Sequence, residues 1–254
     1  MSKKSGPLKE TPIDLQFKEA KARVVYHNYD GILHNLTLVS FNEQRKVLST
    51  MDGLRKVRHV GNVFFPDALS KRHMTLQGYE QVKTDLPKSL GLRRSDFIFL
   101  STAVNMEKVA VCEKSYGDFH VCCIATGGAL DNALRMGVDV GDWVEHKTHM
   151  AHTPGTINML LLTNVTLTCG AMARAIMTAT EAKTAALQDL NYMSTPSPQI
   201  QATGTGTDSM IVVSGVNSDI VIKHTGGHTK MGELIGVAAK TAVTEALKKY
   251  DQNL

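Results

Sequence analysis

The chain has 254 residues, a formal net charge of +4, 43% apolar residues and 20% charged residues. A chain of this length buries a sizeable core, and its composition is typical of globular proteins. The charges form no basic stripe with interleaved aromatic residues, and no apolar run reaches the length of a membrane-spanning helix. Nucleic acids and membranes are therefore not expected as partners.

The N-terminus and the cysteines indicate the compartment. Residues 1–12 are polar and are predicted to be a disordered tail, which leaves residues 13–254 as a single domain. The lysines near the N-terminus are not followed by an apolar stretch, so no secretory signal is predicted. The 4 cysteines form no CxxC pair, as expected for reduced thiols in a cytoplasmic protein.

Strands dominate the first half of the chain. Short runs of branched and aromatic residues predict strands at 22–29, 36–41, 46–50, 61–65, 96–102, 109–114 and 119–125. A helical pattern covers residues 69–90, and Pro87 is expected to end it. After the last of these strands, Gly127 and Gly128 predict a turn into a short helix that ends at Gly137.

Residues 154–190 contain the clearest pair of elements. Residues 157–165 are almost continuously apolar, which predicts a buried strand. Residues 172–190 have a strong helix-forming composition, and Thr168 is a suitable N-cap. The apolar spacing predicts that the inward face of this helix carries Ala173, Ile176, Met177, Thr180, Thr184 and Leu187.

The last part of the chain completes the fold prediction. An exposed loop is predicted at 191–203, and two strands at 209–214 and 219–223. Thr229 suits the N-cap of a C-terminal amphipathic helix, whose inward residues are predicted to be Leu234, Ala238, Val243 and Leu247. Many strands with three or four helices predict an α+β fold with a mixed, largely antiparallel sheet and flanking helices.

The first candidate site lies in residues 125–135. Backbone N–H groups near Gly127 and Gly128, at the start of the predicted helix, are able to hold an oxygen or an anion. Asn132 can donate and accept hydrogen bonds, and Arg135 can bind a carboxylate or phosphate. Taken alone, a plain turn is the favoured interpretation of these glycines.

The second candidate site is the glycine-bearing turn at residues 203–208. The turn lacks the Lys-Ser/Thr ending of a nucleoside-triphosphate loop, so that function is not predicted. Two hydroxyls and a carboxylate, from Thr205, Thr207 and Asp208, suit either recognition of a substrate amide or a buried turn. The residues alone leave both interpretations open.

His228 and Glu181 are candidate bases. His228 follows Gly227 and precedes a predicted helix N-terminus, where the positive field favours a neutral imidazole. The alternative is an exposed histidine whose ring covers the helix cap. Glu181 is a candidate base if its helix is buried on several sides, and otherwise belongs to a solvated helix face.

No metal site is predicted. His146, His149 and His152 have a regular three-residue spacing, but their segment is irregular and lacks a supporting pair of carboxylates.

Four ordered motifs carry a family resemblance. They are ATGGALDNALRMG, PGTINMLLLTNVTLTCGAMARAIMTATEAKTAALQDL, ATGTGTDSMIVVSG and TGGHTKMGELIG, supported upstream by KVLSTMDGLRKVRHVGNVFFP and LSTAVNMEKVAV. Together they resemble the adenosylcobinamide amidohydrolase family over residues 45–246. The chain departs from the glycine-rich family pattern at residues 51–54, where it has only Gly53.

The resemblance implies hydrolysis of the amide that joins aminopropanol to the corrin ring of adenosylcobinamide. The products would be adenosylcobyric acid, which re-enters cobalamin synthesis, and aminopropanol. Amide hydrolysis needs an activated nucleophile, an oxyanion site and an acid for the leaving amine. We predict His228 or Glu181 as the base, acting on water or on the hydroxyl of Thr126 or Thr205.

The remaining roles follow from the same hypothesis. Asp208 is expected to orient the base or to bind an amide arm of the corrin. The oxyanion is expected at the N–H groups near Gly127 and Gly128, together with Asn132. The residues predicted to bind substrate are Gly127, Gly128, Asn132, Arg135, Thr156, Thr205, Thr207 and Gly227.

The expected partner is the corrinoid itself. Its cobalt belongs to the substrate, so no protein-bound metal or other cofactor is expected, and homo-oligomerisation stays open. The alternatives are a corrinoid-binding protein without activity, and an amidase or peptidase with a threonine nucleophile. A weaker resemblance to self-processing β-peptidyl aminopeptidases favours an αββα sandwich, but without a suitable Asn-Ser or Asn-Thr site self-cleavage is not predicted.

Overall fold

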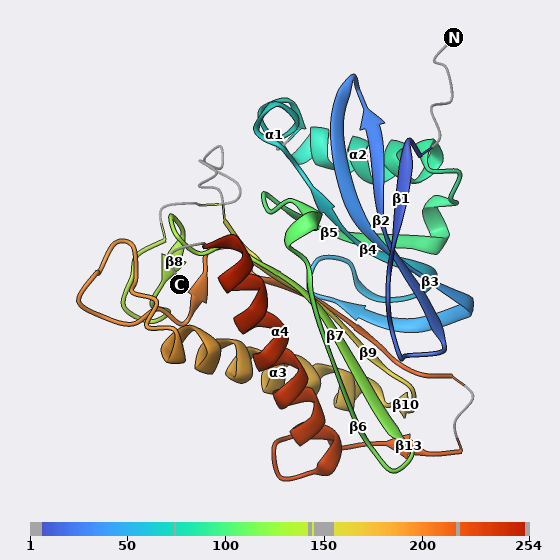
Figure 1. Ribbon diagram of the computed structural model, residues 1–254, viewed down its shortest axis with the longest axis vertical. Helices are drawn as coiled ribbons and strands as arrows, with labels where there is room; N and C mark the ends of the chain where they lie inside the picture. Colours follow the sequence, from blue (N-terminus) through green and yellow to red (C-terminus); the bar gives the residue numbers. More distant parts are fainter. Residues whose placement is uncertain (1–6, 74, 142–143, 145–154, 217–218, 252–254) are drawn as a thin grey trace.

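The computed structural model describes residues 7–73, 75–141, 144, 155–216 and 219–251 (Figure 1). Its strands are β1 Lys9–Ile13, β2 Ala20–Tyr29, β3 Ile32–Ser49, β4 Gly53–Phe64, β5 Phe97–Thr102, β6 Ala110–Tyr116, β7 Phe119–Gly127, β8 Ala133–Leu134, β9 Ile157–Thr163, β10 Thr166–Leu167, β11 Gly204–Thr205, β12 Ser209–Val213 and β13 Val221–Ile222. Its helices are α1 Asp67–His73, α2 Leu76–Ser89, α3 Cys169–Asp189 and α4 Lys230–Tyr250, with 3-10 turns η1 Arg94–Asp96 and η2 Met106–Lys108. None of the helices in these residues is long and apolar enough to cross a membrane.

Nine of the described strands form one mixed sheet. The main path runs β1-β2-β3-β12-β9-β7-β6, while β4 pairs with β3 and with β5. Most neighbours are antiparallel, but β12 runs parallel to β9, and β5 runs parallel to β4. The predicted α+β class with a largely antiparallel sheet is therefore confirmed.

The sheet folds over so that its two halves face each other across a core. Apolar side chains of β2–β5, such as Val39 and Val60, meet side chains of β7, β9 and β12, such as Ile124 and Leu160. Helices α1 and α2 cover the outer face of the first half, and α3 and α4 cover the outer face of the second (Figure 1). The layer order is α, β, β, α, and both β layers belong to one continuous sheet.

Part of the segment predicted to be a disordered tail is a strand. Residues 9–13 form β1, which pairs antiparallel with the edge of β2. Backbone hydrogen bonds to an open sheet edge need no apolar pattern, which explains why the polar composition was misleading. An ion pair between Arg23 and Glu10, 3.1 Å between nitrogen and oxygen, supports the pairing.

The short helix predicted after Gly128 is wrong. The chain forms a turn there and then strand β8, which pairs antiparallel with β11. The N–H of Gly128 donates to the carbonyl of Thr156 at 3.0 Å. Pairing with a distant segment supplies the hydrogen bonds that a local helix would otherwise have made.

Helix α3 begins as predicted but buries a different face. The Thr168 hydroxyl accepts a hydrogen bond from the N–H of Ala171 at 3.2 Å, which confirms the N-cap. Leu187 is buried and Ile176 packs against the core as predicted, but Met177 is 55% exposed and Ala173 and Thr180 are exposed too, so most of the predicted face is wrong. The buried residues are Ala171, Met172, Ala175, Thr178, Ala179, Lys183, Ala186 and Leu187. Small side chains on this face allow close packing against α4 and the sheet.

Helix α4 matches its prediction, and two of its glycines provide a test of packing. The predicted inward residues are all buried, and Thr229 caps the helix by accepting from the N–H of Gly232 at 3.0 Å. A Cβ added at Gly232 would lie 2.0 Å from the carbonyl oxygen of Gly226, whereas one at Gly236 would meet nothing nearer than 4.0 Å.

We expect opposite effects from alanine at these two positions. Gly232→Ala should lower the free energy of unfolding by about 2 to 3 kcal/mol, because backbone must move. Gly236→Ala should raise it by about 0.5 to 1 kcal/mol, since alanine is the better helix former. Urea denaturation of both variants checks this; equal stabilities would contradict it.

A buried histidine pair in β2 and β3 should make stability depend on pH. His27 Nδ1 lies 3.1 Å from His34 Nε2, and both residues are buried. Burial, with a smaller contribution from His27, lowers the pKa of His34 to about 4 from 6.5. Below pH 6.5, His34 is therefore protonated in the unfolded chain, whereas in the folded chain it stays neutral until the pH approaches about 4.

We expect the free energy of unfolding to fall by about 2 to 3 kcal/mol from this group between pH 6.5 and 4.5. The measurement is urea denaturation of wild type and His34→Gln at pH 7 and pH 4.5, because the glutamine does not titrate. The stability difference between the two proteins should shift in favour of the variant at the lower pH. A constant difference would show that His34 does not cause the loss.

Candidate functional site

The ends of several strands bring polar residues together at one end of the folded sheet. Asp208 and Thr156 directly precede the parallel neighbours β12 and β9, while Thr126 lies near the end of β7 and Asn62 near the end of β4. We call the group the polar cluster; it consists of Asn62, Thr126, Thr156, Asn158, Lys183, Thr205 and Asp208.

Asp208 is the most heavily bonded member of the polar cluster. Its Oδ1 accepts from the Thr205 hydroxyl at 2.5 Å and from the N–H of Ile157 at 3.0 Å. Its Oδ2 accepts from the N–H of Thr205 at 3.0 Å and forms an ion pair with Lys183. These donors come from β9, α3 and β11, so the carboxylate is held in one orientation by three elements.

The ion pair of the polar cluster, Lys183 with Asp208, is largely buried but lies next to the surface. The side chains of Lys183 and Asp208 are 8% and 15% exposed. A Cβ at Gly204 would lie 2.5 Å from Asp208 Oδ2 and 2.6 Å from Lys183 Nζ, so only glycine leaves room for this pair. The adjoining Gly206 and Thr207 are exposed, so the turn that carries Thr205 and Asp208 reaches the protein surface.

A chain of hydrogen bonds continues from this point into the core. Thr156 Oγ1 donates to the carbonyl of Thr207 at 2.9 Å and lies 3.3 Å from Asn158 Oδ1. Asn158 Nδ2 donates to Asn62 Oδ1 at 2.9 Å, and Asn62 Nδ2 donates to Thr126 Oγ1 at 2.8 Å. Buried amides that are fully bonded in this way are rigid and orient their neighbours.

Asn132 and the two glycines of residues 125–135 lie beside the polar cluster, whereas Arg135 contacts another segment. Asn132 Nδ2 donates to the carbonyl of Gly155 at 2.7 Å, and Thr207 Oγ1 donates to the same oxygen at 3.1 Å. Arg135 Nη1 instead donates to the carbonyl of Gln201 at 3.1 Å. Leu247 packs close to Gly127, where an added Cβ would lie 3.0 Å from Leu247 Cδ2.

The two predicted bases lie outside the polar cluster. His228, Gly227 and Glu181 are exposed, and within the described residues no hydrogen bond or ion pair joins them to it. Their roles stay predictions. His146, His149 and His152 lie outside the described residues, and among the residues that are described no group of histidine, cysteine, aspartate or glutamate could hold a metal ion.

Three members of the polar cluster are not among the candidates that the sequence indicates. Lys183 lies two residues from Glu181 on α3. It stands at helical spacing between Ala179 and Ala186, a pattern that indicates a lysine on the buried face of the helix. Asn158 precedes four consecutive apolar residues in a fully buried strand, and a buried polar side chain needs hydrogen-bond partners. Asn62 had no local signal, because its partner is 96 residues away in the sequence.

The geometry suits nucleophilic chemistry on an acyl group. A hydroxyl donating to a fixed carboxylate is the arrangement in which the carboxylate can take the hydroxyl proton during attack. Lys183 supplies a positive charge on the other oxygen of Asp208, in surroundings that exclude most water.

Comparisons with known proteins agree on the family. The family model described as adenosylcobinamide amidohydrolase matches residues 19–253. An uncharacterized protein of Methanocaldococcus jannaschii is 40% identical over 252 residues, which cover 94% of this chain and 97% of the relative.

Solved structures are similar at much lower identity. A Burkholderia β-aminopeptidase is 10% identical with a TM-score of 0.43, covering 85% of this chain and 78% of its own. The L-aminopeptidase D-Ala-esterase/amidase of Ochrobactrum anthropi is 11% identical with a TM-score of 0.41, covering 97% and 83%. On the evidence of the family match over nearly its whole length, the chain belongs to the adenosylcobinamide amidohydrolase family.

Proposed function

We propose that the protein hydrolyses the amide between aminopropanol and the corrin ring of adenosylcobinamide, and that the polar cluster is its catalytic centre. Family membership supports the substrate. The observation that carries the chemistry is the 2.5 Å contact between Thr205 Oγ1 and Asp208 Oδ1, with Lys183 paired to the other carboxylate oxygen.

In the first half of the proposed reaction, Thr205 Oγ attacks the carbonyl carbon of the amide while its proton passes to Asp208. The carbon–nitrogen bond then breaks, and the proton on Asp208 moves to the departing nitrogen. Aminopropanol leaves, and the corrin acyl group remains as an ester on Thr205. The exposed backbone at Gly206 is the proposed approach for the carbonyl oxygen, because it directly follows Thr205, which carries the attacking hydroxyl.

In the second half, water attacks the ester and gives up its proton to Asp208. The ester bond breaks, Thr205 recovers its proton, and the corrinoid leaves with a new carboxylic acid. Lys183 keeps the Asp208 carboxylate in place through both halves. The hydrogen-bonded chain from Thr156 to Thr126 fixes the strand ends that carry these groups.

The direct test is incubation of the purified protein with adenosylcobinamide, with and without a chelator, followed by mass spectrometry. We expect adenosylcobyric acid and aminopropanol to form, each to the same extent with the chelator as without it. Tight binding without cleavage would instead make the protein a corrinoid carrier. Activity that the chelator abolishes would contradict catalysis by the polar cluster alone.

The cellular setting belongs to the same proposal. We place the reaction in the cytoplasm, with the corrinoid as the partner and with its cobalt as part of the substrate.

A further inference from the structure

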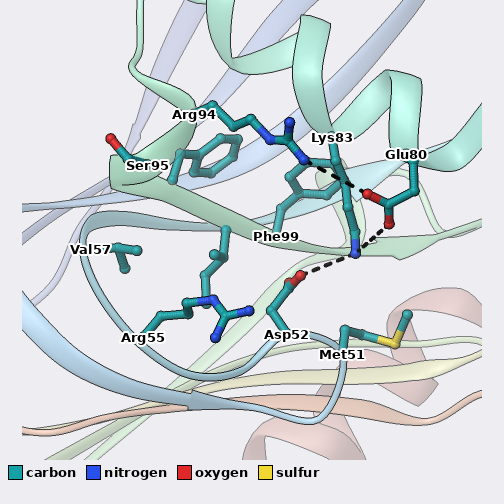
Figure 2. A pocket seen from close by; sticks show the side chains of 11 residues that line it. Met51, Asp52, Arg55, Val57, Glu80, Lys83, Arg94, Ser95 and Phe99 are labelled. Atoms are coloured by element: carbon teal, nitrogen blue, oxygen red, sulfur yellow. Dashed lines mark hydrogen bonds and ion pairs between the residues drawn. The ribbon is translucent and has the colours of Figure 1, made fainter.

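A second charged site lies away from the polar cluster. A pocket of about 400 Å³ opens between the turn that joins β3 to β4, helix α2, and the segment from η1 into β5 (Figure 2). Charged side chains form its rim, and apolar side chains form its floor, among them Val57, Phe97 and Phe99.

The rim alternates positive and negative groups. Lys83 Nζ lies 3.1 Å from Asp52 Oδ1 and 3.2 Å from Glu80 Oε1, and Arg94 is 3.8 Å from the other oxygen of Glu80. Figure 2 shows Arg94 reaching across Phe99 toward Glu80, with Arg55 beside Asp52 on the opposite side. Arg55 donates to the backbone carbonyl of Leu54 at 2.9 Å, and within the described residues it forms no ion pair with a carboxylate.

This arrangement favours a ligand with an apolar body and primary amide arms. An amide group needs an acceptor for its N–H bonds and a donor for its carbonyl, and Asp52 beside Arg55 offers both. The apolar floor suits the methyl-bearing edge of a macrocycle. The rim carries three positive side chains and two carboxylates, so a neutral ligand with both donors and acceptors matches it better than a strongly charged one.

The pocket and the polar cluster lie along the same free edge of β5. Among the described strands, β5 pairs only with β4. Phe99 lines the pocket, and two residues further on the carbonyl of Ser101 accepts from Asn158 Nδ2 at 2.8 Å, a separation of about 7 Å along the strand. On the other side, the N–H of Thr50, next to the pocket, donates to the carbonyl of Met210 at 3.0 Å, two residues after Asp208.

We propose that this pocket is the subsite for the amide-bearing rim of the corrinoid, away from the bond that is cut; this rests on the proposed function. Only a ligand as large as a corrin ring with its arms could contact both places at once; a simple amide could not. Arg55 and Arg94 donate to carbonyls of the amide arms, and Asp52 and Glu80 accept from their nitrogens. The subsite makes the enzyme specific for the large corrinoid.

The test compares Arg55→Ala and Arg94→Ala with Arg58→Ala in steady-state hydrolysis of adenosylcobinamide. Arg58 is the matched control, because it is exposed on the same strand as Arg55 but does not line the pocket. Arg55→Ala should raise KM about tenfold, because the substrate loses one hydrogen bond to a charged group. Its kcat should not change, because that hydrogen bond is equally strong in the ground state and in the transition state. Arg58→Ala should match wild type. An unchanged KM in both pocket variants would overturn the proposal.

Direct binding separates a failure of this subsite from a failure of the proposed function. If wild type cuts no adenosylcobinamide, titration calorimetry with the same compound still compares wild type, Arg55→Ala and Arg58→Ala. About tenfold weaker binding in Arg55→Ala alone would support the subsite without the reaction. Equal binding by all three, or no binding by wild type, would overturn it.

Discussion

Thr205→Val is expected to lower kcat for adenosylcobinamide by about 10⁴-fold or more, while Thr205→Ser should stay within about tenfold of wild type. Valine has nearly the shape of threonine but lacks the hydroxyl that donates to Asp208 at 2.5 Å. Serine keeps that hydroxyl and loses only a methyl group. Both variants are to be assayed for release of aminopropanol, with circular dichroism spectra to show that they fold.

A further measurement tests the same role of Thr205. Acid quenching during turnover should trap the corrin acyl group on Thr205, which intact mass and peptide mapping would locate. Activity of Thr205→Val above about a tenth of wild type would show that another group attacks.

Variants of His228 and Glu181, the two bases predicted from the sequence, serve as comparisons. His228→Ala and Glu181→Ala should each lose less than about tenfold in kcat/KM, since neither side chain joins the polar cluster among the described residues. A larger loss in either variant would restore it as a base and would argue against Asp208 in that role.

Lys183→Met is expected to lower the free energy of unfolding by about 3 to 5 kcal/mol. Lys183 and Asp208 form an ion pair with side chains only 8% and 15% exposed, so removing the lysine leaves a carboxylate largely shielded from water and without its counter-charge. The double variant Lys183→Met with Asp208→Asn should recover a large part of the loss, because it removes that charge. Urea denaturation at pH 7 measures all three proteins.

A surface ion pair provides the matched control for this prediction. Lys240 and Asp189 form an ion pair between α4 and the end of α3, with side chains 43% and 60% exposed. Lys240→Met should change the free energy of unfolding by less than about 1 kcal/mol, because water screens that pair. If Lys183→Met costs no more than Lys240→Met, the burial of the Lys183–Asp208 pair contributes nothing to stability.

The sequence by itself determined the elements whose signals are local. Thr168 and Thr229 marked the starts of two helices because an N-cap hydroxyl bonds to a group three residues away. The apolar run of β9 marked a buried strand for a similarly local reason. The ordered motifs indicated the family, and Thr205 and Asp208 were already among the candidate residues.

Only the tertiary structure decided which side chains meet. Helix α3 is rich in alanine and threonine, so its apolar pattern allows more than one inward face, and packing against α4 selected the face that carries Lys183 rather than Glu181. Asn62 and Asn158 meet across 96 residues because the register of the folded sheet places β4 near β9. Such contacts depend on how distant segments pair, and no local pattern of residues records that pairing.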